Sequence, residues 1–286
     1  MINNDAGKIA VRTACELLGV RRQGYYEWRL RSKSQRQVRD EALTVKIKNI
    51  FFGSRRIYGA RKIVEILARQ GEHVSRRRVR RLMGAAGLVP VIIRRYRTTT
   101  NSKHSLAILP NLLNQDFQAE TINRVWVSDM TYIPTDEGWL YLCTVLDICS
   151  RRVVGWAVSP TIDRHLAIAA LDSAVNARKP DPDWIFHSDR GCQYASSDFK
   201  NALLAAGGIQ SMSRSGNPYD NACAESFFRS LKAESLDTCH FASRLHALHT
   251  VAEYMLFYNR VRIHASLDYR TPVEFESALL ARPLAS

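Results

Sequence analysis

The chain changes character near residue 123. Of its 286 residues, positions 1–122 hold 25 Lys and Arg against 9 Asp and Glu, whereas positions 123–286 hold 16 against 18. The basic part has apolar residues at helical spacing, and the later part opens with β-branched and aromatic runs typical of strands. The sequence therefore predicts a helical region that binds a polyanion, followed by a near-neutral α/β core. A merely solubilising basic surface is the alternative, but it does not explain the clusters of Arg at 76–81 and 94–97.

Residues 8–31 predict a small helical unit. Apolar residues recur at helical spacing up to Leu18, Gly19 interrupts them, and a second helix is expected from about Arg22 to Arg31. Such a pair forms the helix-turn-helix pattern, whose second helix lies in the major groove of DNA. Many helical hairpins share this pattern, and Arg21 stands where Ser or Thr would be a better cap.

A second helix-turn-helix candidate follows. Helices are expected at 38–52, from about 61 to 69 and, with Ser75 as N-cap, from about 76 to 86. The last helix has one apolar stripe, and its arginines lie largely elsewhere, where they can contact DNA phosphates. A solvated basic face is the alternative. The expected DNA-contact residues of this region are Arg76, Arg77, Arg80, Arg81, Arg94 and Arg95.

The core alternates expected strands and helices. Strands are expected at 125–133, 140–148 and 153–158, with a hairpin turn at 136–138, and then at 184–187 and 209–211. Helices are expected at 164–177, at 197–206 and from 218 onward. This order predicts a mixed α/β layer fold. Neither a Gly-x-Gly-x-x-Gly segment nor a P-loop occurs, so no nucleotide cofactor is expected.

These patterns suggest four regions. Residues 1–35 form a first helix-turn-helix-like module and residues 36–97 a second DNA-binding region. Residues 98–122 form a linker of mixed polarity, and residues 123–286 form the core with a C-terminal helical extension.

Three carboxylates in the core suggest a divalent-metal site. Asp129 lies within the first expected strand, Asp189 ends the fourth, and Glu225 lies on the helix that follows. Two Mg²⁺ ions about 3.5–4 Å apart can activate an oxygen nucleophile and stabilise the leaving oxygen of a phosphodiester, and Mg²⁺ takes oxygen ligands. Without a His or Cys ligand set, Zn²⁺ is disfavoured. The structural alternatives are an Asp129 bonded to backbone or Arg, a turn-forming Asp189 and a solvated Glu225.

Other acids compete for these roles. Asp147 is the strongest rival; it ends the second strand, and we interpret it as capping the turn before Ser150. Asp220 and Glu234 share the helix of Glu225.

The sequence predicts a well-defined start for that helix. Asn217 is expected to be its N-cap and Pro218 its first residue, which places Glu225 two turns in. Lys232 follows seven residues later on the same face, where it is expected to meet a DNA phosphate beside the metals.

The sequence also bounds the cell compartment. No apolar run reaches about 18 residues, so no transmembrane helix is expected. The first residues are polar and acidic, unlike a signal peptide. Six cysteines without a Cys-x-x-Cys pair indicate free thiols in a reducing compartment, so we expect a cytoplasmic, nucleoid-associated protein.

Three segments, residues 126–132, 187–194 and 215–228, contain the three acids. They resemble the DDE motifs of bacterial insertion-sequence transposases, in the OrfB type of the insertion-sequence-three group, which has a retroviral-integrase-like core. Residues 258–264 and 267–272 resemble that family's C-terminal motif, and residues 56–61 resemble its upstream helix-turn-helix-like segment. The likeness covers nearly the whole chain, although Cys192 stands where Ser is more usual.

The resemblance implies a ribonuclease-H-like core, with a mixed five-stranded sheet and flanking helices, that binds Mg²⁺ (or Mn²⁺) through Asp129, Asp189 and Glu225. It implies cleavage at the element's ends by water, then attack of the freed 3′-hydroxyl on a second strand, without a covalent protein–DNA intermediate. Lys232 matches the basic residue that this family carries seven positions after the Glu.

The resemblance also implies partners. These are double-stranded DNA, as terminal inverted repeats and target, and further copies of the chain in a homo-oligomer on DNA. The product of an upstream frame is a third expected partner, fused or separate.

A catalytically idle DNA-binding inhibitor, or a domesticated remnant of such an element, is the competing function. The presence of all three acids and Lys232 favours an active enzyme. A plain structure-selective nuclease with a similar core would not explain the basic N-terminal region.

Overall fold

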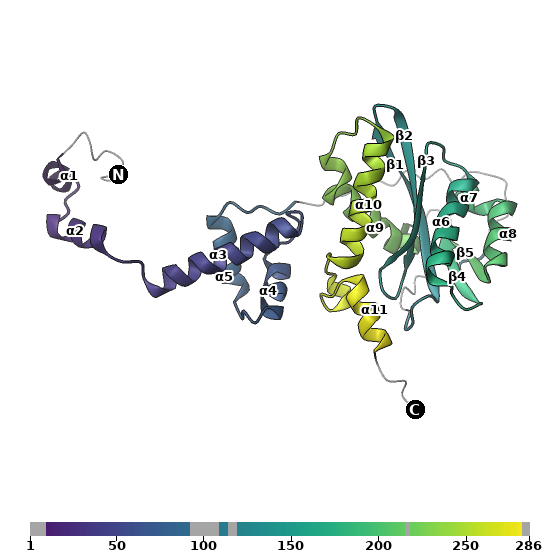
Figure 1. Ribbon diagram of the computed structural model, residues 1–286, viewed down its shortest axis with the longest axis horizontal. Helices are drawn as coiled ribbons and strands as arrows, with labels where there is room; N and C mark the ends of the chain where they lie inside the picture. Colours follow the sequence, from purple (N-terminus) through teal and green to yellow (C-terminus); the bar gives the residue numbers. More distant parts are fainter. Residues whose placement is uncertain (1–9, 92–108, 114–118, 215–217, 282–286) are drawn as a thin grey trace.

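The computed structural model describes residues 10–91, 109–113, 119–214 and 218–281. Within these residues, five helices of the basic part lie to one side of a five-stranded sheet that has its own helices (Figure 1). Most of the expected linker lies outside the described residues, as do Arg94 and Arg95.

The helices of the basic part match those expected from the sequence to within a few residues. The capping prediction for the fifth is confirmed, because the Ser75 side chain accepts a hydrogen bond from the backbone N–H of Arg78. Two of the apolar residues that recur at helical spacing in the first are exposed: Leu17 and Leu18 are 76% and 51% exposed. The five are α1 (Val11–Leu17), α2 (Arg22–Leu30), α3 (Gln35–Gly53), α4 (Ala60–Arg69) and α5 (Arg76–Ala85).

Helices α3, α4 and α5 share one apolar core. The expected stripe of α5 (Val79, Leu82 and Met83) is buried in it, which leaves the other faces of that helix for its arginines. The remaining helical residues of this core are Leu43, Ile47, Phe51, Ile63 and Leu67.

The second part alternates strands and helices as expected. It contains β1 (Val125–Thr135), β2 (Gly138–Asp147), β3 (Val153–Ser159), α6 (Arg164–Arg178), β4 (Trp184–Ser188), α7 (Cys192–Ala195), α8 (Ser197–Ala205) and β5 (Gly208–Met212). It ends with the 3₁₀ turn η1 (Pro218–Asn221), α9 (Ala222–Glu234), η2 (Leu236–Thr238), α10 (Arg244–Arg260), η3 (Ala265–Leu267) and α11 (Pro272–Leu280).

The strand order is β3-β2-β1-β4-β5. Strands β1, β2 and β3 form an antiparallel meander, whereas β4 runs parallel to both β1 and β5. The expected hairpin joins β1 to β2, and Gly138 supplies the positive φ of 100° that it needs. The mixed five-stranded sheet that the resemblance implied is therefore confirmed.

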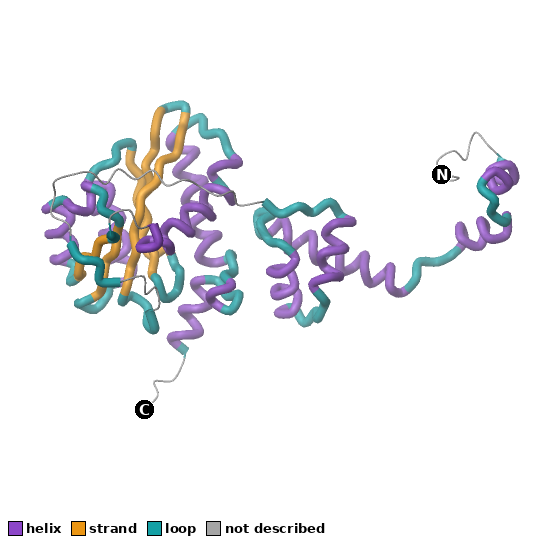
Figure 2. The backbone as a smooth tube through the Cα atoms, turned by 180° about the vertical axis from the view of Figure 1, so that it is seen from behind, coloured by secondary structure: helices purple, strands orange, loops and turns teal. Residues whose placement is uncertain are grey.

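Helices cover both faces of this sheet (Figure 2). Because successive strand residues point to opposite faces, Val127 and Ile133 pack in one core with residues of α9 and α10. Trp126 and Phe186 pack in the other core, with residues of α6 and α8. No helix within the described residues is long and apolar enough to cross a membrane.

Gly155 on β3 permits the close approach of α6. A Cβ at this position would lie 2.5 Å from the backbone N of Ala174 and 2.6 Å from the carbonyl O of Ala170. Backbone cannot yield as a flexible side chain can, so we expect Gly155→Ala to lower the free energy of unfolding by about 2 kcal/mol or more, measured by urea titration.

The matched control is Gly84→Ala on α5, where no atom lies within 4 Å of the added Cβ. We expect that substitution to stabilise by about 0.5–1 kcal/mol, because alanine loses less conformational entropy in a helix. Equal urea midpoints for the two variants would contradict the packing argument.

Candidate catalytic and DNA-binding sites

Adjacent parallel strands bring Asp129 and Asp189 together. Val127 of β1 pairs with His187 of β4, and each acid lies two residues farther along its own strand direction. Side chains two residues apart in a strand point to the same face, so both carboxylates emerge at the same level of the sheet. Val127 lies on the same face and packs in the core with residues of α9 and α10.

Local hydrogen bonds orient the two aspartates. Asp129 Oδ1 accepts from the backbone N–H of Met130 at 2.8 Å, and Asp189 Oδ1 accepts from that of Gly191 at 2.9 Å. A Cβ on Gly191 would lie only 3.1 Å from Asp189 Oδ1, so the glycine leaves room for this carboxylate. Both aspartates are half-buried.

Glu225 reaches the site from α9, whose start differs from the prediction. Pro218 opens the 3₁₀ turn η1, and α9 begins only at Ala222, so Glu225 lies in the first helical turn and not two turns in. Asn217 lies outside the described residues. The side-chain amide of Asn221 donates to the carbonyl of Ser128 at 3.1 Å, which fixes the start of α9 beside Asp129.

The tight turn before α9 has a buried acid at its centre. Asp220 is fully buried and accepts hydrogen bonds from the backbone and guanidinium of Arg214 and from the side-chain amide of Asn111. These bonds hold the chain in a turn where the sequence alone suggested one continuous helix.

The three carboxylates act on one another electrostatically. Burial raises the pKa of Asp129 well above its usual range, and the negative charges of Asp189 and, more weakly, Glu225 raise it further. Burial also raises the pKa of Glu225, which Arg229 partly opposes. The site therefore concentrates negative charge that a bound cation would stabilise.

Lys232 lies at the border of this site. Its Nζ is 5.2 Å from the centroid of the Tyr132 ring, and its positive charge lowers the pKa of Asp129. Burial lowers the pKa of the half-buried Lys232 itself. The lysine is thus placed where the sequence suggested, two helical turns after Glu225 and beside the acids.

The oxygen donors of these residues suit a hard divalent cation, but the three side chains do not form a closed ligand cluster in this structure. Carboxylate oxygens are the ligands that Mg²⁺ and Mn²⁺ prefer, and the pKa of Asp129 is raised by burial and by the charges of Asp189 and Glu225, which a bound cation would offset. Yet the described residues contain no group of three His, Cys, Asp or Glu side chains spaced to hold a metal ion. A closed metal site would require the acids to converge.

The rival acids have structural roles. As expected, Asp147 caps its turn, accepting from the backbone N–H of Ser150 at 3.1 Å; it also accepts from that of Asn123 at 2.6 Å. Asp220 holds the turn before α9. Glu234 is buried against the guanidinium of Arg262 at 2.7 Å. Each rival carboxylate is therefore satisfied by partners away from the site.

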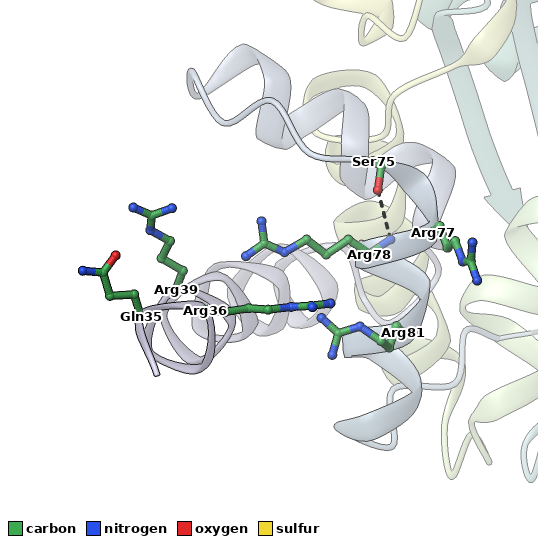
Figure 3. A pocket seen from close by; sticks show the side chains of 7 residues that line it. All are labelled: Gln35, Arg36, Arg39, Ser75, Arg77, Arg78 and Arg81. Carbon is green, nitrogen blue, oxygen red and sulfur yellow. Dashed lines mark hydrogen bonds between the residues drawn. The ribbon is translucent and has the colours of Figure 1, made fainter. Parts of the chain in front are cut away.

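A basic groove lies between the first turns of α3 and α5 (Figure 3). Of the four expected DNA-contact arginines that the structure describes, Arg77 and Arg81 line it, whereas Arg76 and Arg80 are exposed elsewhere on α5. The sequence reasoning missed the contribution of α3, although the spacing of Arg36 and Arg39, three residues apart, indicates one helix face. The groove is lined by Gln35, Arg36, Arg39, Ser75, Arg77, Arg78 and Arg81.

Asp40 organises this groove. Its carboxylate binds the guanidinium of Arg78 at 2.7 Å and that of Arg81 at 2.5 Å. The hydrogen bonds from Arg81 and Arg78 lower the pKa of Asp40. Arg36, Arg39 and Arg77 carry no such bond to Asp40, so they are the groove residues most able to bind a phosphate.

The raised pKa of Asp129 has a consequence for stability. A carboxyl that ionises less readily in the folded chain than in the unfolded chain destabilises the fold as the pH rises above about 4. We expect Asp129→Asn to raise the melting temperature of the metal-free protein by about 2–4 °C at neutral pH, the shift that about 1 kcal/mol gives a domain of this size. The difference should vanish near pH 3. Scanning calorimetry at both pH values measures it.

Glu276 provides a control of opposite sign. Burial opposes its ionisation, but Arg178, Ser150 and Arg152 outweigh burial and lower its pKa. The ionised Glu276 stabilises the fold at pH values above the pKa of this carboxyl in the unfolded chain, and this stabilisation is lost as the pH falls. We therefore expect the melting temperature of Glu276→Gln to lie below that of wild type at neutral pH and to approach the wild-type value in acid. A neutral-pH melting temperature of Asp129→Asn below that of wild type would refute the electrostatic argument.

Three protein-family models match parts of the chain. An integrase core domain family matches residues 119–218, a second integrase core domain family matches residues 207–272, and an HTH-like domain family matches residues 38–96. Among solved structures, a simian T-cell lymphotropic virus intasome in complex with PP2A regulatory subunit B56 gamma has a TM-score of 0.48 at 16% identity, over 65% of this chain and 64% of that one.

Three curated relatives are similar over most of their length. The uncharacterized 31 kDa protein of insertion element IS600 from Shigella sonnei is 41% identical, over 91% of this chain and 96% of the relative. The transposase of IS904 from Lactococcus lactis is 40% identical, over 86% of this chain and 98% of the relative. Transposase InsF of IS3A from Escherichia coli is 38% identical, over 98% of both chains. The chain therefore belongs to the IS3 family of bacterial insertion-sequence transposases, which are DDE polynucleotidyl transferases with an integrase core.

Proposed function

We propose that Asp129, Asp189 and Glu225 are the catalytic carboxylates of this transposase and that they bind two Mg²⁺ (or Mn²⁺) ions when DNA is present. The observation that carries the proposal is the placement of Asp129 and Asp189 on adjacent parallel strands; burial and, after it, the charges of Asp189 and Glu225 raise the pKa of Asp129. Family membership implies a divalent metal. When bound, the ions would activate the attacking oxygen and stabilise the leaving oxygen.

The chain's own residues position the DNA for this chemistry. Asp129 and Asp189 are held by backbone N–H groups and provide a fixed edge of the site, while Glu225, in the first turn of α9, closes it. Lys232 binds a phosphate beside the acids. No side chain acts as a nucleophile, so no covalent protein–DNA intermediate forms.

Two displacements follow at this site. Water attacks a phosphodiester at the element's end, and a P–O bond breaks to leave a free 3′-hydroxyl. That hydroxyl then attacks a target phosphodiester, forming a new P–O bond as the target's own P–O3′ bond breaks. Because the number of phosphodiesters is unchanged in the second step, no external energy source is required.

The remaining assignments extend this proposal. The two DNA-binding modules are residues 1–35 and 36–97. The linker is residues 98–122, and the catalytic region is residues 123–286. The transposase works on terminal inverted repeats and target DNA as a homo-oligomer, with or without the product of an upstream frame, in the cytoplasm at the nucleoid. Retention of the acids and Lys232 favours this active enzyme over an idle inhibitor or remnant.

Loss of one carboxylate tests the catalytic assignment. We expect Asp189→Asn to lower the rate of Mg²⁺-dependent cleavage of the cognate terminal repeat by more than about 100-fold, because even groups that only support metal ligands are worth about 10–100-fold. Asp172→Asn, on an exposed position of α6, is the matched control and should cleave at the wild-type rate. Cleavage by Asp189→Asn at the control's rate would eliminate Asp189 from the site.

The basic groove makes a separate prediction about binding. We expect Arg36→Ala and Arg77→Ala each to weaken DNA binding similarly for all sequences, and to reduce the slope of log affinity against log salt by about 1, as for the loss of one phosphate contact. Arg164→Ala is the control, because Arg164 pairs with Asp198 on α6 and α8, away from the groove. Fluorescence anisotropy over a salt series gives the slopes, and slopes identical to wild type would exclude the groove.

A further inference from the structure

The C-terminal motif, residues 258–272, lies outside the proposed active site. Its residues instead contact two separate parts of the molecule: the α3–α5 domain, which carries the basic groove, and α9, which carries Glu225. Both sets include buried or partly buried hydrogen bonds; those to the α3–α5 domain join residues 203 and 205 positions apart, and those to α9 join residues 28 positions apart.

Tyr58 makes the contact with the DNA-binding domain. This buried side chain lies between α3 and α4, and its hydroxyl donates to the carbonyl of Val261 at 3.0 Å and accepts from the backbone N–H of Ile263 at 2.8 Å. Ile263 is itself part of the apolar core of α3, α4 and α5. The single Tyr58 hydroxyl thus bonds both a backbone carbonyl and a backbone N–H of the C-terminal motif, two residues apart.

A second contact supports the first. The guanidinium of Arg69, at the end of α4, binds the Glu274 carboxylate at 3.3 Å and the backbone carbonyl of Tyr269. The Arg61 guanidinium lies 5.5 Å from the centroid of the Tyr269 ring.

Arg262 makes the contact with α9. Its Nη2 and Nε donate to the Glu234 carboxylate at 2.7 and 2.9 Å, and Glu234 is the last residue of α9, nine positions after Glu225. The Tyr254 hydroxyl donates to the same carboxylate at 2.7 Å. Val261, Arg262 and Ile263 are consecutive, so one short segment holds the DNA-binding domain on one side and the catalytic helix on the other.

We infer that residues 258–272 act as a clamp that fixes the distance between the DNA held by α3–α5 and the catalytic acids, and that this distance selects which phosphodiester is cut. The inference rests on the proposed function. Successive nucleotides of one strand are about 3.4 Å apart, so a displacement of that size between groove and acids would present a neighbouring bond. Tyr58 and Arg69 are therefore positioning residues that determine the cleavage site.

The test maps the cleaved bond. The double variant Tyr58→Phe/Arg69→Ala keeps the packed ring but removes the hydroxyl and the guanidinium. End-labelled DNA carrying the cognate terminal repeat is cut in Mg²⁺, and products are resolved to single nucleotides. We expect wild type to cut one bond and the variant to cut several adjacent bonds, with affinity for the repeat within about twofold of wild type because the groove is intact.

Arg164→Ala is the control. It also removes a side-chain contact, the ion pair with Asp198 between α6 and α8, but it leaves both contacts of the clamp intact, so its products should end at the wild-type bond. Tyr58→Phe alone serves as the milder variant if the double variant does not fold.

The outcomes separate the two proposals. Reduced cleavage confined to the wild-type bond would show a merely stabilising contact and would overturn the clamp. A wild-type protein that binds the repeat but never cleaves it in Mg²⁺ would overturn the proposed function, and the clamp with it.

Discussion

The parallel pairing of β1 with β4 is the interaction on which the site depends. It is short, with three matched pairs ending at Val127 and His187, yet it sets the level at which Asp129 and Asp189 leave the sheet. A register slip of one residue would turn one aspartate to the opposite face. The packing of Val127 opposes such a slip, because the slip would move Val127 out of the core of α9 and α10 and would turn the Asp129 carboxylate toward the apolar core of α6 and α8.

Charge balance separates the candidate site from the other acids of the core. Asp147, Asp220, Glu234 and Glu276 each have nearby hydrogen-bond or guanidinium partners. Burial raises the pKa of Asp147 as well, but Asp147 accepts two backbone hydrogen bonds, whereas at Asp129 the charges of Asp189 and Glu225 add to the effect of burial and destabilise the fold in the absence of a cation. Perturbed carboxyls with neighbouring carboxylates of this kind are typical of functional sites.

Much of this could be predicted from the sequence because it depends on local patterns. Apolar runs of period two predict the strands. Ser75 predicts the start of α5, and Asp147 predicts a capped turn; the structure confirms both. The helix containing Glu225 was placed correctly, but its first residue was wrong. The buried bonds of Asp220 to Arg214 and Asn111, the latter 109 positions away, tighten that start into a 3₁₀ turn, and no local pattern contains them.

The sequence by itself predicted the three candidate acids and determined the division into a basic helical part and a strand-rich core, and the family. Tertiary structure alone decided which charges are neutralised: Asp40 engages Arg78 and Arg81, whereas Arg36 and Arg77 line the groove without bonding to it. It also decided that the C-terminal motif joins Tyr58 to Glu234 through Val261–Ile263. The physical reason is that hydrogen bonds and ion pairs depend on distances of about 3 Å in space, which separations of 30 to 200 residues along the chain do not reveal.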